Sequence, residues 1–488
     1  MSQTLNVHVR VIDSATGKPT PVRIRIAGPD GKYLQPMGRP PDFPVARNED
    51  VGGHVYVGGK HYAYIDGGAE FPLPTAVPLS VEISKGPAFT PIRETVTLGE
   101  GQLTLRFAIC KWAGDQWSDL VAADSRCHFL SPHAAQLEAK AEGIDFVNLL
   151  ATVQDYPSHD GHMYRTIPNM AAFSGQSAAL DGVYVNTFNV HPALGHLSLL
   201  NCHRAVFPLT FGHNDETDDW SLSDWCDQCH RKKGLVVWSD AYRSASGLVG
   251  GEALINTILG KVDAIEFDAL ERTSSLLPIW YRLLNAGLRL APIGGSAKDN
   301  NRGVIGSMRT LTPVGDARSY SEWVEHVRGG RAVVTNGPFL RLTVDDQPFQ
   351  SQFQIKSGQP LRLRAFAESA LPFEKLELIA NGSTIGASKA TGDGIMSAVI
   401  EAEHIFAAGG WVAARCWGST HSAFAHTAPV FIEVDSTPTP RQPTAVAALL
   451  REIADVREWI ENVGRFTIPK RRDHLLALCD TATEKLTG

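Results

Sequence analysis

The sequence has few cysteines, no long block of basic residues and no long apolar segment. Its seven cysteines are an odd number in a chain of 488 residues, which does not suit a disulfide framework. No stretch approaches the roughly 18 consecutive apolar residues of a membrane helix. The first residues, Met1-Ser-Gln-Thr-Leu-Asn-Val, lack the basic start and apolar core of a secretory signal. We therefore expect a cytoplasmic protein with reduced cysteines and no membrane partner.

The charge balance is mildly acidic. Lys and Arg number 45 against 52 Asp and Glu, a net charge of −7 with neutral histidines. Binding to nucleic acid needs clustered Lys and Arg to neutralise phosphates, and the sequence contains no such cluster. The expected partner is therefore a small-molecule substrate or ligand, anionic if Arg126, Lys298 and Arg302 converge, and not nucleic acid. The oligomeric state is not readable, and a homo-oligomer stays open.

Hydrophobic patterning divides the chain into four parts. Residues 1–112 alternate apolar and polar positions, as in Val7-His-Val-Arg-Val-Ile, which predicts an N-terminal β-sandwich. In residues 113–335 strand patterns alternate with helical ones, which predicts a parallel sheet or barrel. Residues 336–435 return to strands and predict a C-terminal β-sandwich. A Pro-rich linker and an amphipathic helical tail follow in 436–488.

The expected helices of the middle part precede its expected strands. Helical patterns occur at 132–142, 222–233 and 279–286, and the strands that follow them at 146–150, 235–238 and 288–293. In α/β barrels and open sheets, the chemistry lies at the carboxyl ends of the strands. Polar residues at five such strand ends are therefore the candidates for a functional site.

Two of these places contain histidine. Asp124, Arg126 and His128 share one face of a strand, because side chains alternate with a period of two. They can hold a metal or an anion, or form a structural ion pair of Asp124 and Arg126 with His128 beside it. His191 and His196 border another buried strand, and neutral imidazole is a common metal ligand. A purely structural role for both histidines stays open.

Three further places contain carboxylates or glycine. Asp240 directly follows the strand at 235–238 and is a metal ligand, a base or a helix N-cap. Glu266 and Asp268 share one strand face, opposite Asp263, so that we expect one acid to point inward. A Gly-Gly turn opens the polar loop 294–301, which contains Ser296, Lys298 and Asp299. Its backbone N–H groups can cradle an oxygen atom, or the loop is an ordinary turn.

The segment Cys226-Asp-Gln-Cys229-His230 satisfies the pattern for c-type haem attachment. Haem attachment requires export, and a zinc knuckle requires a second pair of ligands, which we do not find in the sequence. We predict instead a helix on which both cysteines face the core as small apolar residues.

Several strings resemble the CehA/McbA-type members of the polymerase and histidinol phosphatase (PHP) metallohydrolases. They are Asp124-x-x-x-His128-Phe-Leu-Ser-Pro-His, the segment 138–150, Gly195-His196-Leu-Ser-Leu-Leu, Cys226-Asp-Gln-Cys-His-Arg-Lys, Gly234-Leu-Val-Val-Trp, Gly294-Gly-Ser and Thr335-Asn-Gly-Pro-Phe. The resemblance implies a distorted (β/α)7 barrel between the two β-sandwiches. It also implies divalent metals, such as zinc, manganese or iron, that activate water for ester or phosphoester hydrolysis.

The sequence departs from the family pattern at several metal positions. The family's His-x-His reads Arg126-Cys-His128 here, and Phe188 stands in the segment where the family has a glutamate. Ser239-Asp240 replaces Pro-His, and Ala297 replaces an aspartate, although Asp299 follows. The resemblance therefore implies fewer metal ions than the family norm, or none.

Two functions follow as expectations, with a third in reserve. In the first, a reduced metal site of His128, Asp240 and His191 or His196 activates water for hydrolysis, and Arg126 or Lys298 stabilises the oxyanion. In the second, the barrel is a catalytically inactive pseudoenzyme that binds an anionic ligand or serves in an assembly. The reserve hypothesis is a metal-free enzyme that uses Asp240, Lys298 and Asp299 for acid–base catalysis.

Overall fold

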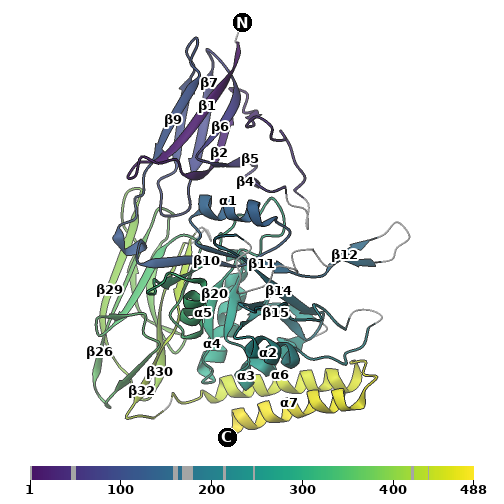
Figure 1. Cartoon of the computed structure of the whole chain (residues 1–488). Coiled ribbons are helices and arrows are strands. Elements are labelled where there is room, and N and C mark those ends of the chain that lie inside the picture. The colour runs from purple at the N-terminus through teal and green to yellow at the C-terminus, as the bar shows by residue number, and fades with distance from the viewer. Residues whose placement is uncertain are drawn as a thin grey trace.

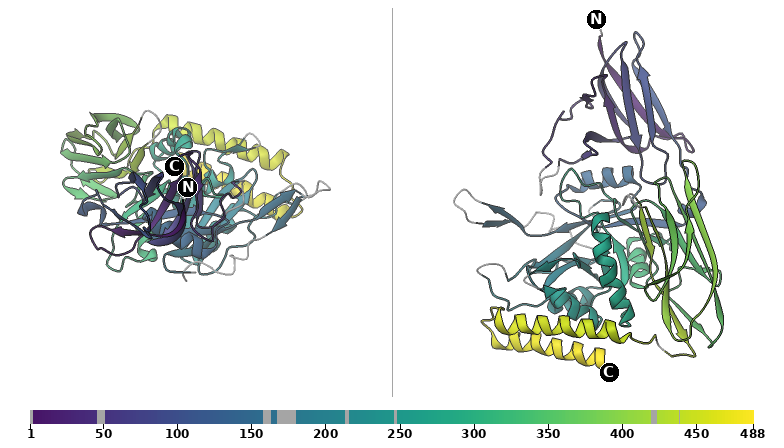
Figure 2. Two further views of the ribbon diagram at one scale, coloured as in Figure 1. Left: turned by 90° about the horizontal axis from the view of Figure 1, so that it is seen from above. Right: turned by 180° about the vertical axis from the view of Figure 1, so that it is seen from behind.

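The computed structural model describes residues 3–45, 51–157, 163–166, 180–212, 216–245, 248–418, 423–437 and 439–488. The N-terminal sheets lie at one end of the molecule and a pair of long helices at the other, with a curled sheet between them (Figures 1 and 2). The structure thus combines mixed α/β and β-rich parts, in agreement with the coarse fold class expected.

The N-terminal part is formed by the strands β1 (Thr4–Asp13), β2 (Pro21–Ala27), β3 (Tyr33–Leu34), β4 (His54–Val57), β5 (Lys60–Asp66), β6 (Gly68–Pro74), β7 (Pro78–Ser84), β8 (Ile92–Thr97) and β9 (Thr104–Ile109). One sheet has the order β6-β1-β9, and the other has the order β4-β5-β2-β7-β8 with β3 beside β2. Val7, Val9 and Val11 of β1 are buried and pack with Val22 and Ile24 of β2 in a common core. This pattern confirms the alternation that the sequence predicts.

The middle of the molecule is a curled, half-barrel sheet. Its strands are β10 (Leu120–Cys127), β11 (Phe146–Ala151), β14 (Val183–His191), β15 (Gly195–Leu200), β16 (Leu235–Ser239), β19 (Ala264–Phe267), β20 (Ala291–Gly294) and β21 (Arg309–Pro313), in the order β20-β19-β16-β15-β14-β11-β10-β21. Strands β10, β11 and β14 are parallel, and so are β16, β19 and β20. Strand β15 runs antiparallel between β14 and β16. The carboxyl ends of the six parallel strands and the start of β15 therefore lie at one edge.

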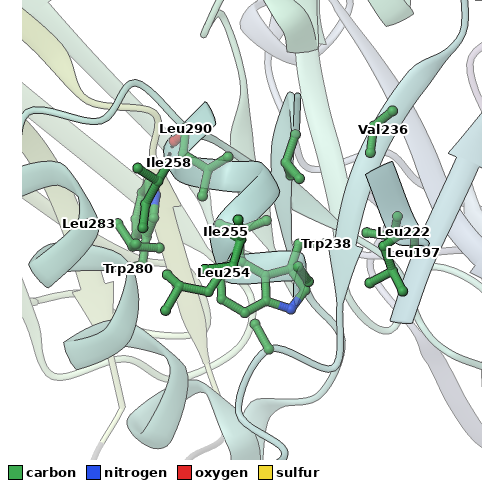
Figure 3. Packing of buried hydrophobic residues seen from close by; sticks show 14 of the residues in the cluster. Leu197, Leu222, Val236, Trp238, Leu254, Ile255, Ile258, Trp280, Leu283 and Leu290 are labelled. Atoms are coloured by element: carbon green, nitrogen blue, oxygen red, sulfur yellow. Dashed lines mark hydrogen bonds between the residues drawn. The ribbon is translucent and has the colours of Figure 1, made fainter. Parts of the chain in front are cut away.

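Helices cover both faces of this sheet. They are α1 (Pro132–Glu142), α2 (Leu222–Arg231), α3 (Gly251–Leu259), α4 (Leu270–Asn285) and α5 (Tyr320–Arg328). On the outer face, Leu222 of α2, Leu254 of α3 and Trp280 of α4 belong to one core with Trp238 of β16 (Figure 3). Helix α5 fills the concave face, where Trp323 belongs to a separate core with apolar residues of the central strands.

The sheet continues beyond β21 into the C-terminal part. The additional strands are β22 (Val333–Thr335), β25 (Gln352–Ile355), β27 (Lys375–Ala380), β28 (Ser383–Lys389), β30 (Gly410–Trp417), β31 (Phe424–Thr427) and β32 (Val430–Val434). Strand β22 pairs with both β21 and β31, so that one sheet continues across residue 335, where the sequence analysis divides the chain. A separate sheet contains β24 (Gln347–Pro348), β23 (Phe339–Val344), β26 (Pro360–Ser369) and β29 (Met396–Ile405). Short pairs are formed by β12 (Gln154–Pro157) with β13 (Met163–Thr166) and by β17 (Ser244–Ala245) with β18 (Leu248–Val249).

The C-terminal residues form two helices, α6 (Pro443–Asn462) and α7 (Pro469–Thr487), that pack on each other and on α3. Leu449 and Ile453 of α6 and Leu475 and Cys479 of α7 are buried there. The expected helical tail is thus a helical hairpin that closes the outer face of the curled sheet.

Local patterns predicted several elements and missed others. Helix α1 has the expected bounds, and α2 carries Cys226 and Cys229 fully buried against the core, as predicted. Helix α3, whose residues from Gly251 to Ile258 are all buried, was not predicted from the sequence. The expected strand at 288–293 begins later, at Ala291, and the expected helix at 279–286 begins earlier, at Leu270, and ends at Asn285.

Candidate active site

A cavity of about 820 Å³ opens at the carboxyl edge of the curled sheet. The polar side chains that line it come from several strand ends: Arg126, His128, Thr152, His196, Asp240, Arg243, Asp268, Arg272, Ser296, Asp299 and Asn300. His196 reaches this edge because β15 is antiparallel, so that its first residues lie beside the last residues of β14 and β16. The structure therefore brings Arg126, His128, His196, Asp240 and Asp299 to one cavity.

The guanidinium of Arg126 lies between three carboxylates at the base of this cavity. Its Nη2 donates hydrogen bonds of 3.0 Å to both Asp240 and Asp268. Its Nε lies 3.0 Å from Oε2 of Glu266, and its charged group stacks on Phe188 at 4.9 Å from the ring centre. The Arg126 side chain is only 4% exposed, so this is a buried ionic network.

Burial and charge act in opposite directions on these carboxylates. Burial opposes ionisation of Asp240, but the positive charge of Arg126 and a hydrogen bond from His196 hold its pKa well below the usual value. Burial dominates at Glu266 and raises its pKa to about 7, although Arg126 lowers it. The same three carboxylates raise the pKa of Arg126 despite its burial. The charged forms of Arg126 and Asp240 therefore stabilise each other.

His196 and Asp240 form a carboxylate–imidazole dyad. Nδ1 of His196 lies 2.7 Å from Oδ2 of Asp240, while Oδ1 of Asp240 accepts from Arg126. A proton on Nδ1 leaves Nε2 as the basic nitrogen. In the described part of the chain no hydrogen bond reaches Nε2, and the ring lines the cavity. The dyad can thus take up a proton from a bound molecule.

The backbone at the cavity is held in an unusual conformation. Asp240, Ala297 and Phe129 have positive φ angles of 52°, 50° and 61°. Residues other than glycine reach this left-handed region only at an energetic cost, and such residues gather at functional sites. All three line the cavity, so the surrounding fold holds a strained rim in place.

Asp124 does not share the environment of Arg126 that strand alternation predicted. The pairing of β10 with β11 shifts register between Asp124 and Cys127, which breaks the period of two. The Asp124 carboxylate accepts hydrogen bonds from three backbone N–H groups, those of Arg126, Ser296 and Gly306. Asp124 therefore fixes the loop after β20. The predicted structural ion pair of Asp124 with Arg126 is replaced by these contacts.

His191 is held outside the cavity. Its Nδ1 accepts from the N–H groups of Ala193 and Leu194, so that Nε2 carries the proton and donates to Asp218 at 2.9 Å. Gly212, with a φ of 76°, passes over this pair where an added Cβ would meet Nε2 at 2.1 Å. Burial lowers the pKa of His191, because the charged ring is poorly solvated there. Both ring nitrogens are used, so His191 is not available as a ligand.

Lys298 also points away from the cavity. Its side chain is fully buried, its Nζ donates to the carbonyls of Asn300 and Gly303, and it lies 3.6 Å from Glu138. Asp299, the next residue, does line the cavity. Arg302 is exposed and does not line the cavity. Lys298 and Arg302 therefore do not join Arg126 in lining the cavity, and Lys298 instead anchors the loop that contains it.

His128 lines the cavity beside the Arg126 network. Its Nδ1 lies 3.1 Å from the carbonyl oxygen of Leu150, which accepts the ring proton. The ring contacts Phe188 edge-on at 5.4 Å. Phe188 thus separates His128 from His196, whose ring contacts it at 5.6 Å.

Sequence reasoning missed Arg243 and Arg272, which line the cavity, and Tyr242, which contacts two of its carboxylates. Tyr242 donates to Asp240 or Asp268, each 3.2 Å away, and accepts from Arg272 at 2.6 Å. Arg272 also donates to Asp268 at 2.6 Å, and Arg243 lies 3.6 Å from Asp240. The spacing of Asp268 and Arg272, four residues apart at a helix start, is the signal that could have revealed the second arginine.

The residues present do not fit the divalent metal site that the family resemblance implies. The space between Asp240, Glu266 and Asp268 holds the guanidinium of Arg126, and a second cation there would meet its charge. His191 is engaged with Asp218. Among the described residues, no group of three or more His, Cys, Asp or Glu side chains is arranged to hold a metal ion.

Within the described residues, no helix is both long and apolar enough to cross a membrane. Family models, curated proteins and solved structures give no match to the sequence or the fold.

Proposed function

We propose that the cavity hydrolyses an ester or phosphoester bond without a metal ion, with His196 as the general base. The observation that carries this proposal is the 2.7 Å contact between Nδ1 of His196 and Asp240. It orients the ring, keeps the proton on Nδ1 and stabilises the imidazolium that forms when Nε2 takes a proton. The hydrolysis, membership of the PHP family and a distorted (β/α)7 barrel are all parts of this proposal.

In the proposed reaction, water replaces the leaving group, and one proton passes to His196 and then to the leaving group. Nε2 of His196 takes a proton from water, and the water oxygen forms a bond to the carbonyl carbon or phosphorus. The bond from that atom to the leaving oxygen breaks, and the imidazolium returns the proton to the leaving alkoxide. Arg243 and Arg272 line the same cavity and supply positive charge for the developing oxyanion. Arg126 is a positioning residue that holds Asp240.

A panel of 4-nitrophenyl esters and phosphate diesters tests this proposal on chelator-treated protein. We expect turnover without metal, and we expect His196→Gln to lower kcat by about 10²–10⁴-fold while KM changes little. His474→Gln is the matched control, because this histidine is exposed on α7 and lies outside the cavity. Turnover that disappears with chelation, or that persists in His196→Gln, overturns the proposal.

The second candidate is a catalytically inactive protein that binds a ligand here. One observation favours it: the charge of Arg126 is already balanced by its carboxylate partners, so that the base of the cavity requires no metal and no substrate to be stable. Ligand binding at the cavity with no turnover of any ester in the panel would support this alternative.

A further inference from the structure

A second cavity, of about 550 Å³, lies at the opposite edge of the curled sheet. It is bounded by the start of β10, by the end of α1 and by the loop between β7 and β8 of the N-terminal sheets. Figure 1 shows α1 between these sheets and the central strands. This cavity lies at the amino ends of β10 and β11, and it shares no lining residue with the cavity around His196.

The lining of the second cavity is strongly basic. Five cationic side chains contribute, namely Lys85, Lys111, Lys140, Arg309 and Arg318, and Asp145 is the single carboxylate among the lining residues. Five positive charges less one negative charge leave four positive charges there, in a chain with a net charge of −7. Asp145 is already paired with Arg318 at 3.0 Å. The chain therefore concentrates positive charge at this cavity.

Arg309 is the central cation of this cavity. It is 4% exposed, and its guanidinium donates to two backbone carbonyls, those of Gly306 at 2.8 Å and Glu142 at 3.0 Å. The Glu142 carboxylate is engaged elsewhere, with Arg23 at 3.2 Å and with Tyr64. Burial lowers the pKa of Arg309 to about 10, against the attraction of more distant carboxylates. A buried guanidinium with carbonyl partners gains from an anion beside it.

Lys85 adds a second, half-buried charge. Its Nζ donates to the carbonyls of Pro21 and Lys140, at 3.1 and 2.9 Å, and burial lowers its pKa. The ammonium group also lies 5.6 Å from the ring centre of Phe89. Phe89, Trp117, Leu120 and Ile144 line the cavity as well, so that an apolar wall faces the charged groups.

We propose that this second cavity binds a small organic anion, with its phosphate or carboxylate group at Arg309 and Lys85 and its apolar body against Phe89 and Ile144. The size suits such a molecule, because ligand cavities are typically about 300–1,000 Å³ and combine apolar walls with a few fixed polar groups. The bidentate geometry of a guanidinium matches both kinds of oxyanion. This site is separate from the proposed hydrolysis and does not depend on it.

Calorimetric titration of the full chain with phenyl phosphate, benzoate, phenol and inorganic phosphate tests the proposal. We expect phenyl phosphate or benzoate to bind at least about tenfold more tightly than phenol or inorganic phosphate, because only these two probes carry both an anionic and an apolar part. Tighter binding of phenyl phosphate would identify a phosphate site, and tighter binding of benzoate a carboxylate site. Equal affinity for phenol and the anionic probes, or no binding of either anion, overturns the proposal.

Charge reversal at the rim locates the binding. Lys111→Glu combined with Lys140→Glu should weaken the preferred probe by about tenfold or more, because both exposed lysines line the cavity. Lys356→Glu is the matched control, an exposed lysine outside both cavities, and should change affinity less than about twofold. An equal loss in this control would show a nonspecific charge effect and overturn the site.

Two more variants separate the cavities and probe the buried charge. Arg309→Lys keeps a cation but loses the planar fork, and should weaken binding while the thermal unfolding temperature shows that the protein is folded. Arg272→Ala alters only the cavity around His196 and should leave the affinity within about twofold. Loss of binding in Arg272→Ala, or full binding in Arg309→Lys together with the rim variants, overturns the assignment.

Discussion

Nη2 of Arg126 donates a 3.0 Å hydrogen bond to Oδ1 of Asp240, although the two residues lie 114 positions apart in the chain. The same nitrogen bonds to Asp268, and the other oxygen of Asp240 bonds to His196. One guanidinium thus joins the ends of three strands and orients the imidazole that faces the cavity. A substitution of Arg126 should therefore affect both the stability of the fold and the proposed orientation of His196.

Removal of this guanidinium should destabilise the protein strongly. Arg126→Met leaves Asp240, Glu266 and Asp268 buried together without a cation, and we expect a loss of about 3–5 kcal/mol in the free energy of unfolding. Urea unfolding measures this change. The control Arg106→Met, at an exposed position on β9, should stay within about 0.5 kcal/mol of the unsubstituted protein. Equal stability of the two variants would show that the network contributes nothing.

Arg126→His should increase the uptake of zinc. The substitution removes the buried cation and adds a second histidine near His128, beside the carboxylates of Asp240 and Asp268. Equilibrium dialysis followed by elemental analysis measures bound metal. Arg126→Met is the matched control, since it removes the same charge without adding a ring nitrogen. Equal zinc content in both variants would contradict the prediction.

Glu252 should make stability fall as the pH rises. This carboxyl accepts the N–H groups of Leu222 and Ser223 at the start of α2, and burial raises its pKa from 4.5 to about 7. Between these values the folded state retains a proton that the unfolded state has released, so the stabilisation present below pH 4.5 is lost on passing pH 7.

Glu252→Gln keeps the size of this side chain and removes the titration, although its amide nitrogen cannot accept a backbone N–H as the second carboxyl oxygen does. Between pH 4.5 and pH 7, the unsubstituted chain should lose up to about 3 kcal/mol of unfolding free energy that the variant does not lose. Urea unfolding at a series of pH values measures the difference. A difference that does not vary with pH would show that Glu252 titrates alike in the folded and unfolded states.

Asp218 should hold the C-terminal helical hairpin in place. Its carboxylate accepts from His191 at 2.9 Å and from the backbone N–H of Arg465, between α6 and α7, at 2.6 Å. Asp218→Ala leaves the buried Nε2–H of His191 unpaired, and we expect a loss of about 1–3 kcal/mol. Hydrogen exchange should accelerate most in α6 and α7. Asp473→Ala, at an exposed position on α7, should change neither quantity.

Local sequence determined the elements that depend on near neighbours. The alternation of Val7, Val9 and Val11 specifies a strand with one buried face. In α1, Ser131 caps the first turn, Pro132 begins the helix and Gly143 ends it in a left-handed conformation with a φ of 69°. These signals act within a few residues of each other, so they can be read without knowledge of the fold. The polar residues that follow the central strands were readable for the same reason.

Tertiary structure alone decided which of those polar residues meet. The register shift in β10 turned Asp124 toward backbone N–H groups, mainly those of the loop after β20, and not toward the Arg126 guanidinium. The antiparallel β15 placed His196 against Asp240, whereas His191 forms its hydrogen bond with Asp218. The partners of Arg126 lie 114 to 142 positions away, and their choice depends on the order and curl of the strands. Side-chain spacing along one strand contains no information about that order. The contacts between these side chains could therefore be identified only from the folded structure.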